Sequence, residues 1–228
     1  TGPQSSHVEL LLKHAPNKLT NMSAAQNRVM KSNYYSKVTL IDDCVGRIID
    51  KLKKLNLMNN TWILFSSDHG EMLGDHGLLA KKVFYDGAVN VPCLFRSPRG
   101  EGQGTLPALT CHLDIVATLI DISGAEPLQN CDGRSLLPIL NGKCIEDPRS
   151  AVLSELGLPP SAFIMVRTKT QKLSVEAASR QPVEHYDLNQ DPCELHNLVG
   201  DPDYDSTRSE IVNEVMKPML KTLETTTW

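Results

Sequence analysis

WILFSSDHGEMLGDHGLLAKKVFYDGAVNVPCLFR, residues 62–96, is the stretch of sequence that decides the fold. It opens with four apolar residues, 62–65, as expected of a strand covered on both faces in a parallel sheet. Five residues that are polar or glycine, 66–70, follow at once. Because open α/β sheets bind ligands at the carboxyl ends of their strands, this switch predicts a ligand site. Asp68 and His69 would offer neighbouring oxygen and nitrogen donors to one ion there.

Residue chemistry alone leaves two interpretations of Asp68-His69-Gly70 open. Such a tripeptide is usually a turn with a helix-capping aspartate, and only a minority of them bind metal. The longer string around this tripeptide is more specific. SSDHGEMLGDHG, followed by Lys81, by Tyr85-Asp86 and by Val91-Pro92, closely resembles the second half of type I sulfatases, which belong to the alkaline-phosphatase-like superfamily.

This resemblance implies a role for three residues. In the family, the aspartate and the histidine or asparagine of the matching motif bind a divalent cation, and a downstream lysine contacts the sulfate group. Carried onto this chain, the resemblance implies Asp68 and His69 as metal ligands and Lys81 as the sulfate contact. The family's spacing to the tyrosine favours Lys81 over Lys82. Calcium is the expected metal, with manganese or magnesium as alternatives, because a histidine ligand suits calcium less well.

Other polar residues of the chain are interpreted as structural. His76 and the adjacent Asp75 repeat the Asp-His-Gly pattern, and we expect them to support the site without binding the metal. His112 stands between a predicted strand and a predicted helix, and the family pattern demands no histidine there. His185 and His196 fall in a segment that the family uses structurally.

Bulk composition is ordinary for a globular protein: of 228 residues, 40% are hydrophobic and 22% are charged. The net charge of -4 argues against nonspecific binding to nucleic acid. We expect no membrane span and find no signal peptide. The start at Thr1, without methionine, suggests a processed or excised segment. The six scattered cysteines leave the compartment open; the resemblance favours a periplasmic, secreted or lysosomal location, and a cytoplasmic location stays open.

Hydrophobic periodicity predicts a long helix over residues 33–57, after a loop over 1–32 that includes a short helix near 8–12. Asp42 and Asp43 sit within the long helix, where neighbouring side chains point about 100° apart, so a solvated or packing role is favoured over metal binding. The apolar face of this helix consists of Val38, Ile41, Val45, Ile48, Leu52 and Leu55.

Further elements follow in the middle of the chain. Residues 91–95 are predicted to form a buried strand, and residues 106–111 a second strand. A helix begins after it, with Asp114 or a neighbour as its N-cap. Its predicted inward face consists of Ile115, Leu119 and Ile122, and Gly124 ends it.

The carboxy-terminal part changes in composition. Residues 132–138 resemble a short helix of the family, and four short runs then predict a small antiparallel sheet: 151–155, 163–168, 172–176 and 185–188. A last helix over 206–223 should be interrupted by Pro218. The expected fold is α/β: the second half of an alkaline-phosphatase-like doubly wound sheet in residues 1–147, followed by a small α+β subdomain in residues 148–228 with an antiparallel sheet and a carboxy-terminal helix.

The family's nucleophile has no counterpart in this sequence. It is a formylglycine hydrate made from the Cys or Ser of a Cys/Ser-x-Pro-x-Arg motif, and no cysteine or serine here has Pro at +2 and Arg at +4. We therefore expect a carboxy-terminal fragment of a sulfatase, inactive alone, whose substrate is a sulfated small molecule or glycan. The alternatives are a fragment of a related metal-dependent phosphodiesterase or phosphonate hydrolase, and a noncatalytic binding protein with this fold.

Overall fold

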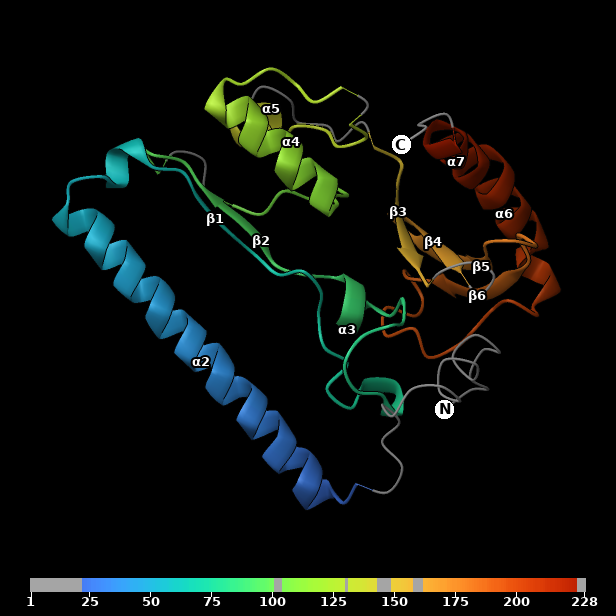
Figure 1. Ribbon diagram of the computed structural model, residues 1–228. Coiled ribbons are helices and arrows are strands. Elements are labelled where there is room, and N and C mark those ends of the chain that lie inside the picture. Colours follow the sequence, from blue (N-terminus) through green and yellow to red (C-terminus); the bar gives the residue numbers. More distant parts are fainter. Residues whose placement is uncertain (1–21, 101–103, 130, 143–148, 158–161, 225–228) are drawn as a thin grey trace. The chain divides into compact units, whose positions relative to one another are not determined.

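The computed structural model describes residues 22–100, 104–129, 131–142, 149–157 and 162–224. They divide into two compact units (Figure 1). The helix–ribbon unit comprises the described residues of 14–81 and 85–104, and the sheet unit comprises those of 82–84 and 105–228. The domain boundary expected after residue 147 stays a prediction.

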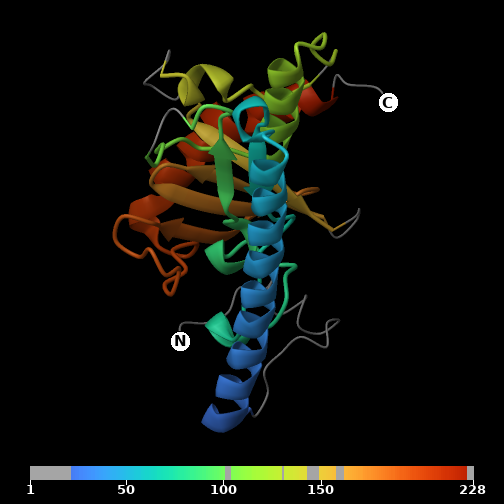
Figure 2. The same ribbon diagram turned by 90° about the vertical axis from the view of Figure 1, so that its left-hand side faces the viewer.

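The helix–ribbon unit is built around α2 (Ala24–Lys54), the long helix seen in Figures 1 and 2. Our expectation of a loop up to residue 32 was wrong. Ser23 and Gln26 form a capping box: the Ser23 side chain accepts from the Gln26 N–H at 3.2 Å, and the Gln26 side chain accepts from the Ser23 N–H at 2.8 Å. This start signal is polar and precedes the apolar repeat, so periodicity alone missed it. The helix predicted near residues 8–12 lies outside the described residues.

The apolar face predicted for α2 is not covered within the described structure. None of its residues is buried, and the side chains of Val38, Ile41 and Ile48 are 48%, 51% and 62% exposed. Asp42 and Asp43 are exposed as well, which agrees with a solvated role. The 3₁₀ turn η1 (Met58–Asn60) follows the helix and leads to the first strand.

β1 (Ile63–Ser66) and β2 (Cys93–Arg96) form a two-stranded ribbon. The expectation that residues 62–65 lie in a parallel sheet, covered on both faces, was wrong. The strands pair antiparallel, with Phe65 opposite Leu94, and these two side chains are 38% and 56% exposed. A four-residue apolar run does not encode the direction of its partner. Among the described strands, no third one joins this ribbon.

Short turns connect β1 to β2. These are the 3₁₀ turn η2 (Asp75–Gly77) and the short helix α3 (Asp86–Val89). The rest of the segment is irregular.

In the sheet unit, α4 (His112–Ser123) starts differently from the prediction. Residues 106–111 form no strand. Cys111 is the N-cap, and Asp114 lies one turn inside the helix, where its carboxylate accepts from the Cys111 N–H at 2.8 Å. Gly124 ends the helix with a φ of 70°, as predicted.

α4 buries its polar side, which is the reverse of our expectation. Asp114 and Thr118 are 1% and 0% exposed, whereas Leu119 is 44% exposed. Asp114 accepts from the Arg134 N–H at 2.8 Å and pairs with both terminal nitrogens of Arg149, each at 2.7 Å. Asp114 thus accepts hydrogen bonds from a neighbouring loop and from a buried guanidinium. These hydrogen bonds outweighed the apolar periodicity in orienting the helix. The short helix α5 (Leu137–Leu140) follows, as predicted.

The predicted four-stranded antiparallel sheet is confirmed. It consists of β3 (Ala151–Leu156), β4 (Phe163–Thr168), β5 (Gln171–Glu176) and β6 (Pro182–Asp187), paired in this order. One face carries Val166, Leu173 and Val175, all fully buried, and packs against the carboxy-terminal helices. This is the core of the sheet unit.

The last helical segment is interrupted, as Pro218 predicted. It runs through the 3₁₀ turn η3 (Pro202–Tyr204), α6 (Asp205–Glu210), the π-helical segment η4 (Ile211–Met216) and α7 (Lys217–Glu224). Pro218 has no N–H to donate to the preceding turn, so an undisturbed α-helical ladder cannot form there. Ile211, Met216 and Leu220 still reach the core.

Within the described part of the chain, every helix is too short or too polar to cross a membrane. Cys44, Cys93, Cys111, Cys131 and Cys193 are thiols, and Cys144 lies outside the described residues.

Candidate metal and anion site

The segment that follows β1 is fixed by a close backbone contact. A Cβ atom on Gly70 would lie 2.1 Å from the carbonyl oxygen of Gly87, so only glycine fits there. The Gly70 N–H also donates to the Ala88 carbonyl at 2.8 Å. These two contacts hold the backbone next to Asp68 and His69 in one conformation.

His69 presents one ring nitrogen for coordination. Its Nδ1 lies 2.8 Å from the Gly70 carbonyl oxygen, which can only accept a hydrogen bond. Nδ1 therefore donates to this carbonyl, which leaves Nε2 as the ring nitrogen that faces Asp68. Nε2 lies 3.3 Å from Oδ2 of Asp68, so the two donor atoms converge.

Asp68 is poised in its ionised form. Its pKa is lowered chiefly because the His69 N–H donates to Oδ1 at 3.0 Å, and the nearby charges of His69 and Lys81 lower it further. The side chain is 84% exposed, so an ion from solution can reach the carboxylate.

These two side chains fit part of a divalent metal site. A carboxylate oxygen and an imidazole nitrogen 3.3 Å apart can both contact one ion, at the usual ligand distances of roughly 2.0–2.6 Å. Among the residues that the structure describes, no three His, Cys, Asp or Glu side chains gather as a metal group. The remaining coordination positions would belong to water or to groups beyond this set.

Lys81 and Lys82 lie in an irregular segment in which the backbone φ angle changes sign from residue to residue. The φ angles of Ala80 and Lys82 are 62° and 81°, in the left-handed region that residues other than glycine rarely adopt. Lys81 is exposed, and its charge acts on the Asp68 carboxylate.

The second Asp-His-Gly makes different contacts. The His76 ring stacks on Tyr85 with centroids 3.8 Å apart and planes 7° from parallel. Asp75 lies 3.9 Å from Lys31. These contacts agree with the structural role expected of both residues.

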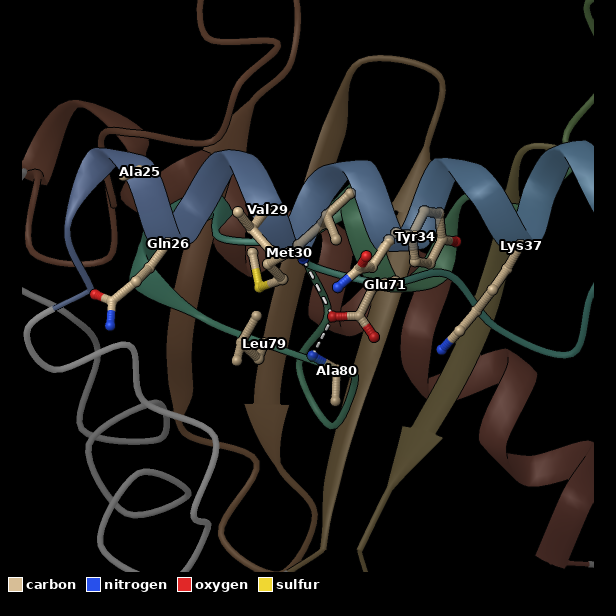
Figure 3. A pocket seen from close by; sticks show the side chains of 11 residues that line it. Ala25, Gln26, Val29, Met30, Tyr34, Lys37, Glu71, Leu79 and Ala80 are labelled. Atoms are coloured by element: carbon tan, nitrogen blue, oxygen red, sulfur yellow. Dashed lines mark hydrogen bonds between the residues drawn. The ribbon is translucent and has the colours of Figure 1, made fainter.

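Glu71 is a residue of this site that sequence reasoning missed. Its carboxylate accepts from the Leu73 N–H at 3.2 Å and from the Ala80 N–H, which closes the loop between His69 and Lys81 (Figure 3). No spacing in the sequence distinguishes Glu71 from an ordinary surface glutamate. The loop and the first half of α2 border an open groove of about 770 Å³, lined on the helix side by residues such as Met30, Tyr34 and Lys37.

The other histidines that the structure describes are His112, His185 and His196. His112 and His196 are exposed in the sheet unit. His185 is fully buried in β6, where its Nε2 is 2.9 Å from Oε1 of Gln171. This burial agrees with the structural role expected of His185.

Comparison with known proteins gives consistent matches to one family. The model of the family described as "Sulfatase" matches residues 2–125, and the model described as "N-sulphoglucosamine sulphohydrolase, C-terminal" matches residues 74–221. A choline-sulfatase of Rhizobium meliloti (strain 1021) is 34% identical over 187 residues, which cover 80% of this chain and 36% of the relative.

Solved structures confirm the fold class. A phosphonate monoester hydrolase of Agrobacterium radiobacter has a TM-score of 0.77 at 28% identity, covering 88% of this chain and 43% of the other. A protein solved in complex with its substrate D-glucosamine-2-N,6-O-disulfate has a TM-score of 0.72 at 24% identity, covering 82% of this chain and 40% of the other. The chain thus spans well under half the length of these relatives.

Proposed function

The chain belongs to the sulfatase family, and from this premise we propose that it serves the hydrolysis of sulfate esters with a divalent metal, calcium first among the candidates. One observation supports the site most directly. Oδ2 of Asp68 and Nε2 of His69 converge to 3.3 Å after β1, in a backbone that admits only glycine at position 70.

Each of the three proposed site residues has a separate task. Asp68 and His69 hold the cation, one as an ionised oxygen ligand and the other through Nε2, with its ring oriented by the Gly70 carbonyl. The Lys81 ammonium binds a sulfate oxygen and stabilises the negative charge of the transition state. When bound, a divalent ion supplies Lewis-acid polarisation of the sulfate group.

The nucleophile is proposed to lie outside this sequence. A formylglycine needs a Cys/Ser-x-Pro-x-Arg motif, which these 228 residues do not contain. We therefore propose that the 228-residue chain alone does not turn over sulfate esters. The substrate is proposed to be a sulfated small molecule or glycan, and the compartment to be periplasmic, secreted or lysosomal.

A phosphonate monoester or phosphodiester is the second candidate substrate. The 28% identity and TM-score of 0.77 to a phosphonate monoester hydrolase support it. Sulfate and phosphonate esters both present oxygens to a metal and a lysine, so the residues described here serve either substrate.

Kinetics on an enzyme that contains this sequence, including a formylglycine, decide between the candidates. We expect kcat/KM for an aryl sulfate to exceed that for the matching aryl phosphonate monoester, and Asp68→Asn to reduce both. A preference for the phosphonate would replace the sulfate assignment. Saturable binding of sulfated ligands without turnover of either ester would favour a noncatalytic binding protein.

A further inference from the structure

On β5 and β6, the second face of the four-stranded sheet is buried and polar. β5 contributes Lys172 and Ser174 to this face, 2% exposed each, and β6 contributes Glu184 and Tyr186, 3% and 4% exposed. Cross-strand pairing places Lys172 opposite Tyr186 and Ser174 opposite Glu184. A buried lysine on a sheet face needs an explanation, because taking an ammonium out of water is costly.

Lys172 holds a distant piece of backbone. Its Nζ donates to the carbonyl oxygen of Phe84 at 3.0 Å and pairs with the carboxylate of Glu194, whose side chain is 3% exposed. Segment 82–84 belongs to the sheet unit, although 88 positions separate Phe84 from Lys172 in the sequence. Phe84, Lys172 and Tyr186 also line one small pocket, together with Ser174 and Glu184.

Stability alone does not account for this ion pair. Replacing a buried pair by apolar side chains of similar volume is often neutral or stabilising. The Lys172–Glu194 pair instead fixes the position of one backbone group, the Phe84 carbonyl, relative to the sheet. On the same face, the Ser174 hydroxyl donates a hydrogen bond of 3.0 Å to the Glu184 carboxylate.

The backbone held in this way carries Lys81. The Ala80 N–H is bound by the Glu71 carboxylate, and the Phe84 carbonyl is bound by Lys172. Lys81 therefore lies between two points, each anchored by a charged side chain. The positive φ angles of Ala80 and Lys82 are strained conformations that persist only where the surroundings enforce them.

We propose that Lys172, paired with Glu194, is a positioning residue: it anchors segment 82–84 and so keeps the preceding Lys81 in the backbone conformation that serves the anion. This proposal rests on the proposed function only in the role given to Lys81. The anchoring itself is tested without any activity.

Limited proteolysis tests the anchoring in the 228-residue chain. Trypsin cleaves after Lys81 and Lys82 only when this segment opens locally. We expect Lys172→Met to raise the cleavage rate there about tenfold, measured by mass spectrometry. Lys169→Met is the matched control, because Lys169 is exposed in the β4–β5 turn, and it should leave the rate unchanged. Cleavage after Lys54, at the end of α2, calibrates the rate between samples. Equal cleavage after Lys81 and Lys82 in both variants would refute the anchoring.

A double-mutant cycle tests the positioning in an enzyme that contains this sequence. We expect Lys172→Met to lower kcat for an aryl sulfate about tenfold, and to lower it no further in the Lys81→Ala background, because Lys172 acts through Lys81. Losses that multiply in the double variant would show that Lys172 acts independently and would overturn the proposal. If Lys172→Met does not fold, Glu194→Gln undergoes both tests with the same criteria. An unimpaired Lys81→Ala enzyme would instead remove Lys81 from the proposed function, while the proteolysis result stands.

Discussion

Acidification should destabilise the sheet unit through His185, the fully buried histidine of β6. The pKa of its imidazole is lowered to about 4, chiefly by burial and also by the positive charge of Arg208, against a smaller opposing effect of Asp187. Its ring bonds Gln171 through Nε2, and its edge meets the ring of Tyr204 at a centroid distance of 5.5 Å. This environment favours the neutral imidazole in the folded state.

The sign and size of the effect follow from linkage. In the unfolded chain the imidazole has a pKa of about 6.5, so between pH 6.5 and pH 4 the unfolded state takes up a proton that the folded state refuses. The stability contributed by the neutral ring is intact above pH 6.5 and is lost as the pH falls toward 4. Between pH 7 and pH 5, the expected loss of unfolding free energy is about 2 kcal/mol.

Urea denaturation followed by circular dichroism at pH 7 and pH 5 measures this loss. Other groups also titrate, so the informative quantity is the difference in unfolding free energy between the native chain and His185→Gln. That difference should shift by about 2 kcal/mol between the two pH values, in favour of the variant at pH 5. His196→Gln is the matched control, because His196 is exposed in the same unit. A His185→Gln difference that is equal at both pH values would refute the reasoning.

Three further predictions concern the proposed site. In an enzyme that contains this sequence, Lys81→Ala should reduce kcat for small and large sulfate esters alike by roughly 10²- to 10³-fold, and Lys82→Ala should change it little; a larger loss for Lys82→Ala would move the sulfate contact by one residue. The 228-residue chain should bind calcium or manganese weakly, with a dissociation constant of about 10⁻⁴ M or weaker, because two side chains leave most positions to water; tight calorimetric binding that survives Asp68→Ala would contradict the ligand assignment. Purified 228-residue chain should not hydrolyse an aryl sulfate, and turnover that follows the chain through purification would contradict the proposed external nucleophile.

The sequence predicted best where one pattern determined the structure. β3 to β6 follow from short β-rich runs separated by turn residues, and the chain neighbours pair in order. The antiparallel pairing of Phe65 with Leu94 was not predictable, because apolar runs carry no information about strand direction. The orientation of α4 was misjudged because Asp114 and Thr118 find hydrogen-bond partners that lie far along the chain.

The candidate site was likewise predicted only in part. Asp68, His69 and Lys81 were singled out by resemblance to a family, because local chemistry alone favoured a capping turn over a metal site at Asp68-His69-Gly70. Glu71 and the anchoring contact of Lys172 were not predicted, because the partners are backbone groups at Ala80 and Phe84. The spacing of residue types in a sequence does not predict a contact between a side chain and a distant backbone atom.

The π-helical turn in the last helix gives the protein an unusual tolerance for a change in length. Residues five apart in an α-helix point about 140° away from each other, whereas a π turn brings them back to one face. Ile211 and Met216 are five apart and both buried. Deleting the exposed Asn213 would leave them four apart, which is the spacing of neighbours on one face of an α-helix. The core would keep its side chains, whereas a single deletion inside β5 would turn every later residue of that strand to the opposite face.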